Sequence, residues 1–176
     1  MSDSSASSYA SELLGEARYC LRCGVRLESR TMFERERPCC PRCGFVFFLD
    51  PKVAVGVLAE RDDRLLLTLR NHEPRIGSWS FPSGYLEAFE DPLDGVVREA
   101  FEETGIEVAI ECLIGVYREP DSRVLYLAYA GRAGPGEPRP SHESTDVRFF
   151  SADALPELGF VHDRRILADW RRLVGR

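Results

Sequence analysis

The feature of the sequence that most constrains its fold is an acidic segment, residues 84–106, which reads GYLEAFEDPLDGVVREAFEETGI. Within it, Glu99, Glu102 and Glu103 are spaced i, i+3 and i+4. At about 100° per residue, this spacing predicts three carboxylates on one face of a helix. Oxygen-only ligation selects Mg²⁺ or Mn²⁺, and Mg²⁺ is typically shared with substrate phosphates. The segment therefore indicates a metal site used in phosphate chemistry.

The same segment carries the start and stop signals of a helix. Asp91 can cap the helix, Pro92 suits its first position, and Asp94 places an acid near the positive end of the helix dipole. Gly105 suits the left-handed residue that ends a helix. The stripe opposite the acids is predicted to pack on a core and consists of Leu93, Val96, Val97, Ala100, Phe101 and Thr104.

A run of glutamates on its own is more often a solvated helix face than a metal site. That alternative does not account for Gly84, for Glu90 at a fixed offset, or for Arg98 beside the first acid. Like charges at i and i+4 also destabilise a helix unless something neutralises them. A bound cation would neutralise them.

These residues resemble the signature of the Nudix hydrolases, which runs Gly, five residues, Glu, seven residues, then Arg-Glu-aliphatic-any-Glu-Glu-any-Gly-aliphatic. Every specified position is met, with Ala100 and Ile106 in the aliphatic places. The resemblance implies an α/β/α sandwich around a mixed β-sheet. It implies an enzyme that splits a diphosphate bond in a nucleoside diphosphate joined to another group, using water and a divalent metal. It also implies that the metal ligands are Glu99, Glu102 and Glu103.

Other residues of the site follow from the same resemblance. We expect Arg98 to orient Glu99 or to pair with Glu90, and Gly84 to let backbone approach closely. Glu143 matches a position where relatives often place an additional metal ligand or the general base. A solvated loop carboxylate is the alternative for Glu143.

Two cysteine pairs upstream, CLRCG and CPRCG, are separated by 16 residues. This spacing predicts a zinc ribbon with a closed, structural Zn²⁺ site whose ligands are Cys20, Cys23, Cys40 and Cys43. A disulfide framework is the weaker alternative, because no signal peptide is evident. Cys39 is expected to be a bystander, and Cys112, in an apolar run, a small core residue.

The chain is therefore predicted to comprise a flexible tail (residues 1–17, with a short helix over 9–17), a zinc ribbon (18–46) and a Nudix domain (47–176). Within the domain, the patterning predicts strands over residues 52–59, 64–70, 108–117, 124–130 and 146–150. Residues 131–140 are expected to form a loop and residues 163–173 a closing helix.

Composition limits the partners. The formal net charge of −6 argues against sequence-independent nucleic-acid binding over the whole surface. Residues 18–43, however, carry seven arginines against Glu28, Glu34 and Glu36, so a local nucleic-acid patch stays open. No apolar run is long enough to span a membrane, and we expect a cytoplasmic enzyme with a small nucleotide substrate. Dimers are common in the family, which leaves a homodimer open.

A ribbon placed directly before the domain resembles the zinc-ribbon Nudix group, which includes NADH pyrophosphatases and relatives similar to ADP-ribose and FAD pyrophosphatases. The NADH enzymes carry a Ser-Gln-Pro-Trp-Pro-Phe-Pro-any-Ser element after the Nudix segment, and nothing after Ile106 matches it. This difference favours ADP-ribose or FAD, with release of AMP. Two alternatives remain: a sensor that binds ADP-ribose without cleaving it, and an RNA 5′-end decapping hydrolase guided by the ribbon.

The sequence does not select the residues that recognise the base. An adenine could stack on an aromatic ring, and a distal phosphate could bind an arginine. The candidates are Phe33, Phe48, Trp79, Phe81 and Tyr85 for stacking, and Arg70 and Arg118 for the phosphate.

Overall fold

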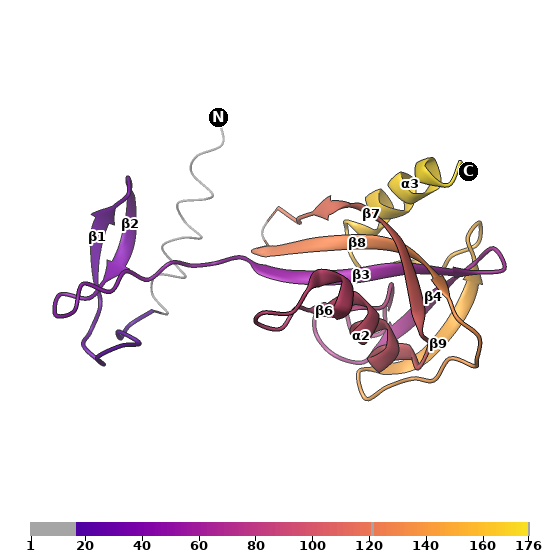
Figure 1. Ribbon diagram of the computed structural model, residues 1–176, viewed down its shortest axis with the longest axis horizontal. Helices are drawn as coiled ribbons and strands as arrows, with labels where there is room; N and C mark the ends of the chain where they lie inside the picture. Colours follow the sequence, from indigo (N-terminus) through magenta and orange to yellow (C-terminus); the bar gives the residue numbers. More distant parts are fainter. Residues whose placement is uncertain (1–16, 121, 176) are drawn as a thin grey trace. The chain divides into compact units, whose positions relative to one another are not determined.

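The computed structural model describes residues 17–120 and 122–175 (Figure 1). The chain divides into two compact units, Met1–Asp50 and Pro51–Arg176. The expected tail over residues 1–17, with its short helix, lies outside the described residues except for Ala17.

The first unit contains one antiparallel hairpin, formed by β1 (Glu28–Met32) and β2 (Arg35–Cys39). Each cysteine pair lies in a tight turn closed by a glycine. The Gly24 N–H donates to Cys20 O at 2.9 Å, and the Gly44 N–H donates to Cys40 O at 3.1 Å. Both glycines have φ near +70°, a conformation that glycine adopts without steric cost.

The second unit is built on a seven-stranded sheet. Its central path runs β5-β4-β3-β8-β7, while β6 pairs with β3 and β9 pairs with β4. The β3–β8 pair is parallel and the others are antiparallel, so the sheet is mixed. The strands are β3 (Lys52–Arg61), β4 (Arg64–Arg70), β5 (Trp79–Ser80), β6 (Ser83–Tyr85), β7 (Val108–Tyr117), β8 (Val124–Ala133) and β9 (Ser144–Ser151).

Two helices cover opposite faces of this sheet, α2 (Pro92–Thr104) and α3 (Asp163–Leu173) (Figure 1). Successive side chains of β4 point to opposite faces of the sheet, as they do along any strand. Leu65 and Leu67 pack in the cluster that includes Trp170 of α3, whereas Leu66 packs in the cluster that includes Val96 of α2. The predicted α/β/α sandwich with a mixed sheet is confirmed. No helix in the described part of the chain is long and apolar enough to cross a membrane.

The ends of α2 follow the local signals. The Asp91 side chain accepts a hydrogen bond from the Leu93 N–H at 2.8 Å, and Pro92 occupies the first turn. Gly105 has φ 70°, and its N–H donates to Phe101 O at 2.7 Å. The predicted helix is therefore confirmed at both ends.

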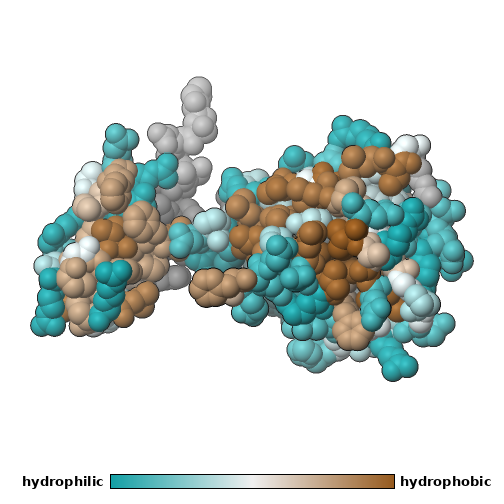
Figure 2. Space-filling model, in the orientation of Figure 1, coloured by the Kyte–Doolittle hydropathy of each residue, from teal (hydrophilic) through white to brown (hydrophobic). Residues whose placement is uncertain are grey.

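The predicted core stripe of α2 is partly wrong. Val96, Ala100 and Thr104 are buried, but Leu93, Val97 and Phe101 are exposed. The stripe assigned to the core was too wide, because the sheet contacts a narrower face that also includes Glu103. On the face of the second unit shown in Figure 2, hydrophobic residues reach the surface among hydrophilic ones.

Two further expectations need correction. Cys112 is exposed rather than buried, since it lies on β7, which pairs on one side with β8 and forms an end of the central path. Residues 131–133 belong to β8 and not to the loop, because β8 continues to pair with β3 and β7 up to this point.

Candidate functional site

A cavity of about 530 Å³ opens on the second unit. Gly84 and Tyr85 of β6, Glu99 of α2 and Glu143 before β9 lie in its wall. The first three belong to the acidic segment, and Glu143 is about forty residues away in sequence. The fold thus brings these predicted site residues to one cavity.

Gly84 allows Glu99 to reach this position. A Cβ atom added to Gly84 would lie 2.1 Å from the Glu99 carboxyl carbon. A side chain at residue 84 and the present position of the Glu99 carboxylate are therefore incompatible. Burial raises the pKa of Glu99, with Glu102 and Glu143 adding to the rise and the Arg98 guanidinium opposing it.

Glu103 is buried one helical turn further along α2. Its Oε2 atom accepts a hydrogen bond from the Ser83 N–H at 3.0 Å. Burial, together with the negative charges of Glu99 and Glu143, raises the pKa of Glu103 to about 8, and the Ser83 N–H and Arg70 act in the opposite direction. A buried carboxylate beside other carboxylates fits a site that receives a cation.

Glu102 differs from the other two acids, because its side chain is 58% exposed. At about 100° per residue, Glu103 lies about 40° to one side of Glu99 around the helix and Glu102 about 60° to the other side, so the two can differ in burial. Within the described ranges, the three carboxylates are not gathered within 4.8 Å of one another, as the ligand atoms of a closed metal site would be.

Arg98 links the acids to the loop before the helix. Its Nε and Nη2 atoms donate to Glu90 Oε1 and Oε2 at 2.6 and 2.8 Å. Its Nη1 atom donates to Glu99 at 2.7 Å and to Glu102 at 3.1 Å. The hydrogen bonds from Arg98 lower the pKa of Glu90 to about 2. Arg98 thus makes both contacts considered from the sequence, orienting Glu99 and pairing with Glu90.

Glu143 is held at the cavity through its backbone. Its carbonyl oxygen accepts from the Asn71 N–H at 3.1 Å and lies 3.2 Å from His72 Nδ1. The side chain is half-exposed, and its Oε1 atom lies 3.5 Å from Nε2 of the exposed His142 side chain. The backbone contacts thus hold residue 143 in the cavity wall, while its carboxylate is half-exposed.

The cavity wall also contains Tyr126, Phe160 and His162, which were not expected from the sequence. The Phe160 ring stacks on the His162 ring at 5.3 Å between centroids, and Tyr126 lies 4.7 Å from His162 on a tilted plane. Arg70 lies over Phe160 at 5.2 Å. No local sequence pattern predicts that Phe160 or His162 belongs to the site. They reach it because the segment before α3 packs next to β8 in the folded protein.

Only some of the residues proposed for base recognition line the cavity. Tyr85, Arg70 and Arg118 line the cavity, and Tyr85 is 51% exposed. Phe81 is in the core, and Trp79 packs edge-on against Phe150 at 4.7 Å. Phe33 and Phe48 belong to the first unit and not to the cavity unit.

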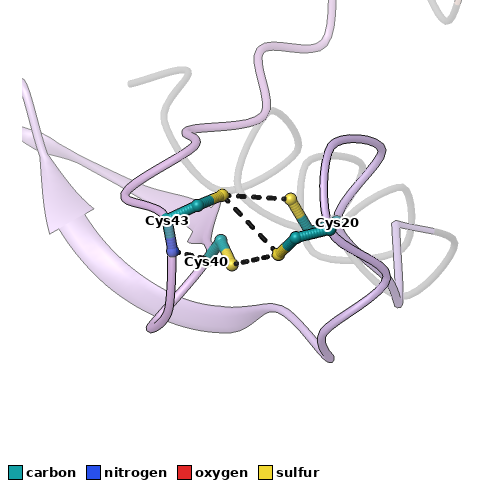
Figure 3. A group of neighbouring side chains, drawn as sticks. Cys20, Cys40 and Cys43 are labelled. Carbon is teal, nitrogen blue, oxygen red and sulfur yellow. Dashed lines mark hydrogen bonds between the residues drawn. The ribbon is translucent and has the colours of Figure 1, made fainter.

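The four cysteines of the first unit form a compact cluster (Figure 3). The sulfur of Cys20 lies 3.5 Å from that of Cys43, and the sulfur of Cys23 lies 3.4 Å from that of Cys40. A disulfide needs sulfurs about 2 Å apart, whereas a tetrahedral Zn–S₄ site with bonds of about 2.3 Å places them roughly 3.8 Å apart. The distances fit a zinc ribbon and not a disulfide framework.

Cys39 is adjacent in sequence but outside this cluster. Its buried thiol donates to Arg37 O at 3.5 Å. By contrast, the N–H of Cys43 donates to the sulfur of Cys40, which lowers the pKa of Cys40 to about 6 and favours the thiolate that zinc binds. Cys39 therefore lies outside the four-cysteine cluster, as expected for a bystander.

Comparison with known families decides the class of the protein. The family model of the NUDIX domain matches residues 50–170. The chain belongs to the Nudix family. It is a Nudix hydrolase, a class that splits diphosphate bonds with the help of a divalent metal.

Relatives of this Nudix hydrolase cover different shares of it. An ADP-ribose pyrophosphatase of Methanocaldococcus jannaschii is 33% identical over 129 residues, 71% of this chain and 76% of that protein. The NAD-capped RNA hydrolase NudC of Pseudomonas aeruginosa is 36% identical over 145 residues, 80% of this chain but 50% of NudC. The chain thus spans about half the length of NudC.

A solved structure extends the similarity to most of the chain. A NUDIX hydrolase from Nitrosomonas europaea superposes with a TM-score of 0.82 at 29% identity, covering 90% of this chain and 94% of that one.

Proposed function

We propose that this Nudix hydrolase cleaves the diphosphate bond of a nucleoside diphosphate joined to another group, of the ADP-ribose or FAD type, and releases AMP. The observation that carries the proposal is the meeting of Gly84, Glu99 and Glu143 at one cavity, with Glu103 buried behind them. The cavity volume of about 530 Å³ is in the range of small-molecule sites. ADP-ribose is favoured because the relative from M. jannaschii is named for that substrate.

We propose that Glu99, Glu102 and Glu103, with Glu143, hold Mg²⁺ or Mn²⁺, since the donors are all carboxylate oxygens. The cation would supply charge neutralisation at the bridging phosphates and a bound water of lowered pKa. Arg98 positions Glu99, and the Ser83 N–H fixes the Glu103 carboxylate. The cysteine cluster would hold Zn²⁺ as a structural ion, because four thiolates leave no open position for a substrate.

The test is a mass-resolved cleavage panel with Mg²⁺ or Mn²⁺. ADP-ribose, FAD, NADH, nucleoside triphosphates and capped RNA are offered to the wild type and to Glu103→Gln. We expect AMP from a dinucleotide or ADP-ribose, and loss of turnover in the variant by more than the roughly 10- to 100-fold that outer partners of metal ligands contribute. An unaffected rate would remove Glu103 from the metal site. Binding of ADP-ribose without cleavage by the wild type would support the sensor alternative.

A second candidate function is decapping of RNA 5′ ends. It is supported by the similarity to NudC, which is named for NAD-capped RNA, and by the arginine-rich first unit. The two candidates differ in the panel. A decapping enzyme should prefer the capped RNA over the free dinucleotide, whereas a small-molecule pyrophosphatase should not.

A further inference from the structure

The hairpin between β1 and β2 turns through a conformation that is unfavourable for the residue at its tip. Met32 pairs with Arg35, so Phe33 and Glu34 form a two-residue turn, with φ values of 52° and 62°. Positive φ at both positions is the type I′ geometry, which favours Asn, Asp and Gly. Phenylalanine is a rare occupant of this region, because its Cβ crowds the neighbouring carbonyl.

The hairpin between β3 and β4 provides an internal comparison. Its two-residue turn, Asp62 and Asp63, has φ values of 53° and 59°. Aspartate tolerates this region because its short polar side chain can bond locally to the backbone. The backbone of such a turn therefore does not favour an aromatic residue at position 33.

The Phe33 side chain is outside any core. Phe33 is 70% exposed, and its ring lies 6.0 Å from the ring of Phe48, which is 47% exposed. The Arg37 guanidinium lies over the Phe48 ring, 4.7 Å from its centroid. The Nε atom of Arg37 donates to Met32 O at 3.2 Å. The exposed rings of Phe33 and Phe48 and the half-buried Arg37 thus form a row of flat groups, which we call the aromatic platform.

Phe33 and Arg37 lie in an arginine-rich segment, residues 18–43, and Phe48 follows shortly after it. Residues 18–43 hold seven of the 23 basic residues and three of the 29 acidic ones, a surplus of four positive charges in a chain with net charge −6. Two of the three acids are engaged. Glu28 pairs with Arg30 at 3.0 Å, and Glu36 accepts from the Ser29 and Thr31 hydroxyls. Four thiolates around Zn²⁺ would carry about two negative charges, which leaves residues 18–43 with a surplus of about two positive charges.

We propose that the aromatic platform binds the unpaired bases of single-stranded RNA, while the surrounding arginines contact its phosphates. Exposed rings beside guanidinium groups on a basic surface are the features that bind single strands with little sequence preference. The charge surplus favours a polyanion over an apolar protein segment. The choice of RNA rests on the second candidate function; the stacking geometry does not.

The test uses the full chain, zinc-loaded and without Mg²⁺, so that RNA is bound but not cleaved. Anisotropy of a short, unstructured, labelled RNA should report binding at low salt, with a log–log salt slope of about −0.7 for each phosphate contact. Phe33→Gly should weaken binding roughly 5- to 100-fold, the loss expected for one stacked base. Glycine suits positive φ, so this variant should keep its zinc and its melting temperature.

Leu21→Ala is the matched control, since Leu21 is 81% exposed in the same unit but has no ring. It should bind RNA as the wild type does. A duplex RNA of the same sequence should bind more weakly, because its bases are already stacked. The proposal is overturned if the wild type does not bind at low salt, if Phe33→Gly binds equally well, or if the duplex binds equally well.

The same variants separate this proposal from the hydrolase function. Phe33→Gly should hydrolyse ADP-ribose with Mg²⁺ at the wild-type rate. If the wild type cleaves no small nucleotide, the proposed substrate is wrong, while the RNA-binding result stands on its own.

Discussion

The Arg98 guanidinium binds the Glu90 carboxylate through two parallel hydrogen bonds of 2.6 and 2.8 Å, and its remaining Nη1 atom binds Glu99. Glu90 precedes α2, and both Arg98 and Glu99 lie on it. One planar group therefore sets the position of an acid in the cavity wall relative to the loop before the helix.

Replacing this group tests its positioning role. Lysine keeps the charge but cannot form the fork to Glu90 and also bind Glu99. We expect Arg98→Lys to lower kcat/KM by about 10- to 100-fold and to raise the Mg²⁺ concentration needed for half-maximal rate. Arg132→Lys is the control, because Arg132 pairs with Glu111 and Glu60, neither of which lines the cavity. A normal metal requirement in Arg98→Lys would contradict the positioning role.

Gly84→Ala should separate folding from activity. The added Cβ would overlap the Glu99 carboxyl group, which is the far end of a flexible side chain, so the fold can accommodate it while Glu99 moves. A displacement of about 1 Å at a reacting site costs on the order of 100-fold in rate. The expected result is an unchanged circular dichroism spectrum and melting temperature with a large loss of kcat/KM. Wild-type activity in this variant would show that the position of Glu99 is not critical.

The adjacent residues Cys39 and Cys40 allow a direct test of the zinc site. Cys40→Ser should lose the metal, because the site then has three thiolates, and the ribbon should become sensitive to protease. Cys39→Ser should keep about one zinc per chain, since its thiol only donates to Arg37 O. Zinc content is measured on protein purified under reducing conditions. Equal metal loss in both variants would contradict the four-cysteine assignment.

Asp163 should make the stability of the protein depend on pH. Burial, aided by the charge of Glu119, raises the pKa of Asp163 to about 7, while the Phe160 N–H and Arg70 oppose the rise; His162 is the other titratable neighbour. A folded-state pKa above the unfolded value means that the folded state binds more protons. The free energy of unfolding should therefore fall by a few kcal/mol as pH rises from about 4 to 7.

Asp163→Asn removes this titration and keeps an acceptor for the Phe160 N–H. Urea unfolding at several pH values should show a flatter profile for the variant than for the wild type. Parallel profiles would mean that another group causes the pH dependence.

The sequence predicted α2 well because its signals are local. Asp91 and Gly105 act on backbone atoms within a few residues of themselves, so their effect does not depend on the rest of the fold. The clustering of the four cysteines was predictable for a similar reason, since all four lie in two short CxxC segments.

The environment of each glutamate was less predictable. Helical spacing placed Glu99, Glu102 and Glu103 near one another, but the sheet contacts only part of that face. Glu103 became buried and Glu102 stayed exposed. Cys112 was misassigned because a run of apolar residues does not reveal which strand lies at the end of a sheet.

By itself, then, the sequence determined the family, the helix that carries the acids, and the two cysteine knuckles, because each depends on residues close together along the chain. The tertiary structure decided which carboxylate is buried, that Glu143 joins Glu99 at one cavity, and that Phe160 and His162 line the same cavity. These relations depend on segments that are distant in sequence and meet only when the sheet and its two helices pack together, which no local pattern records.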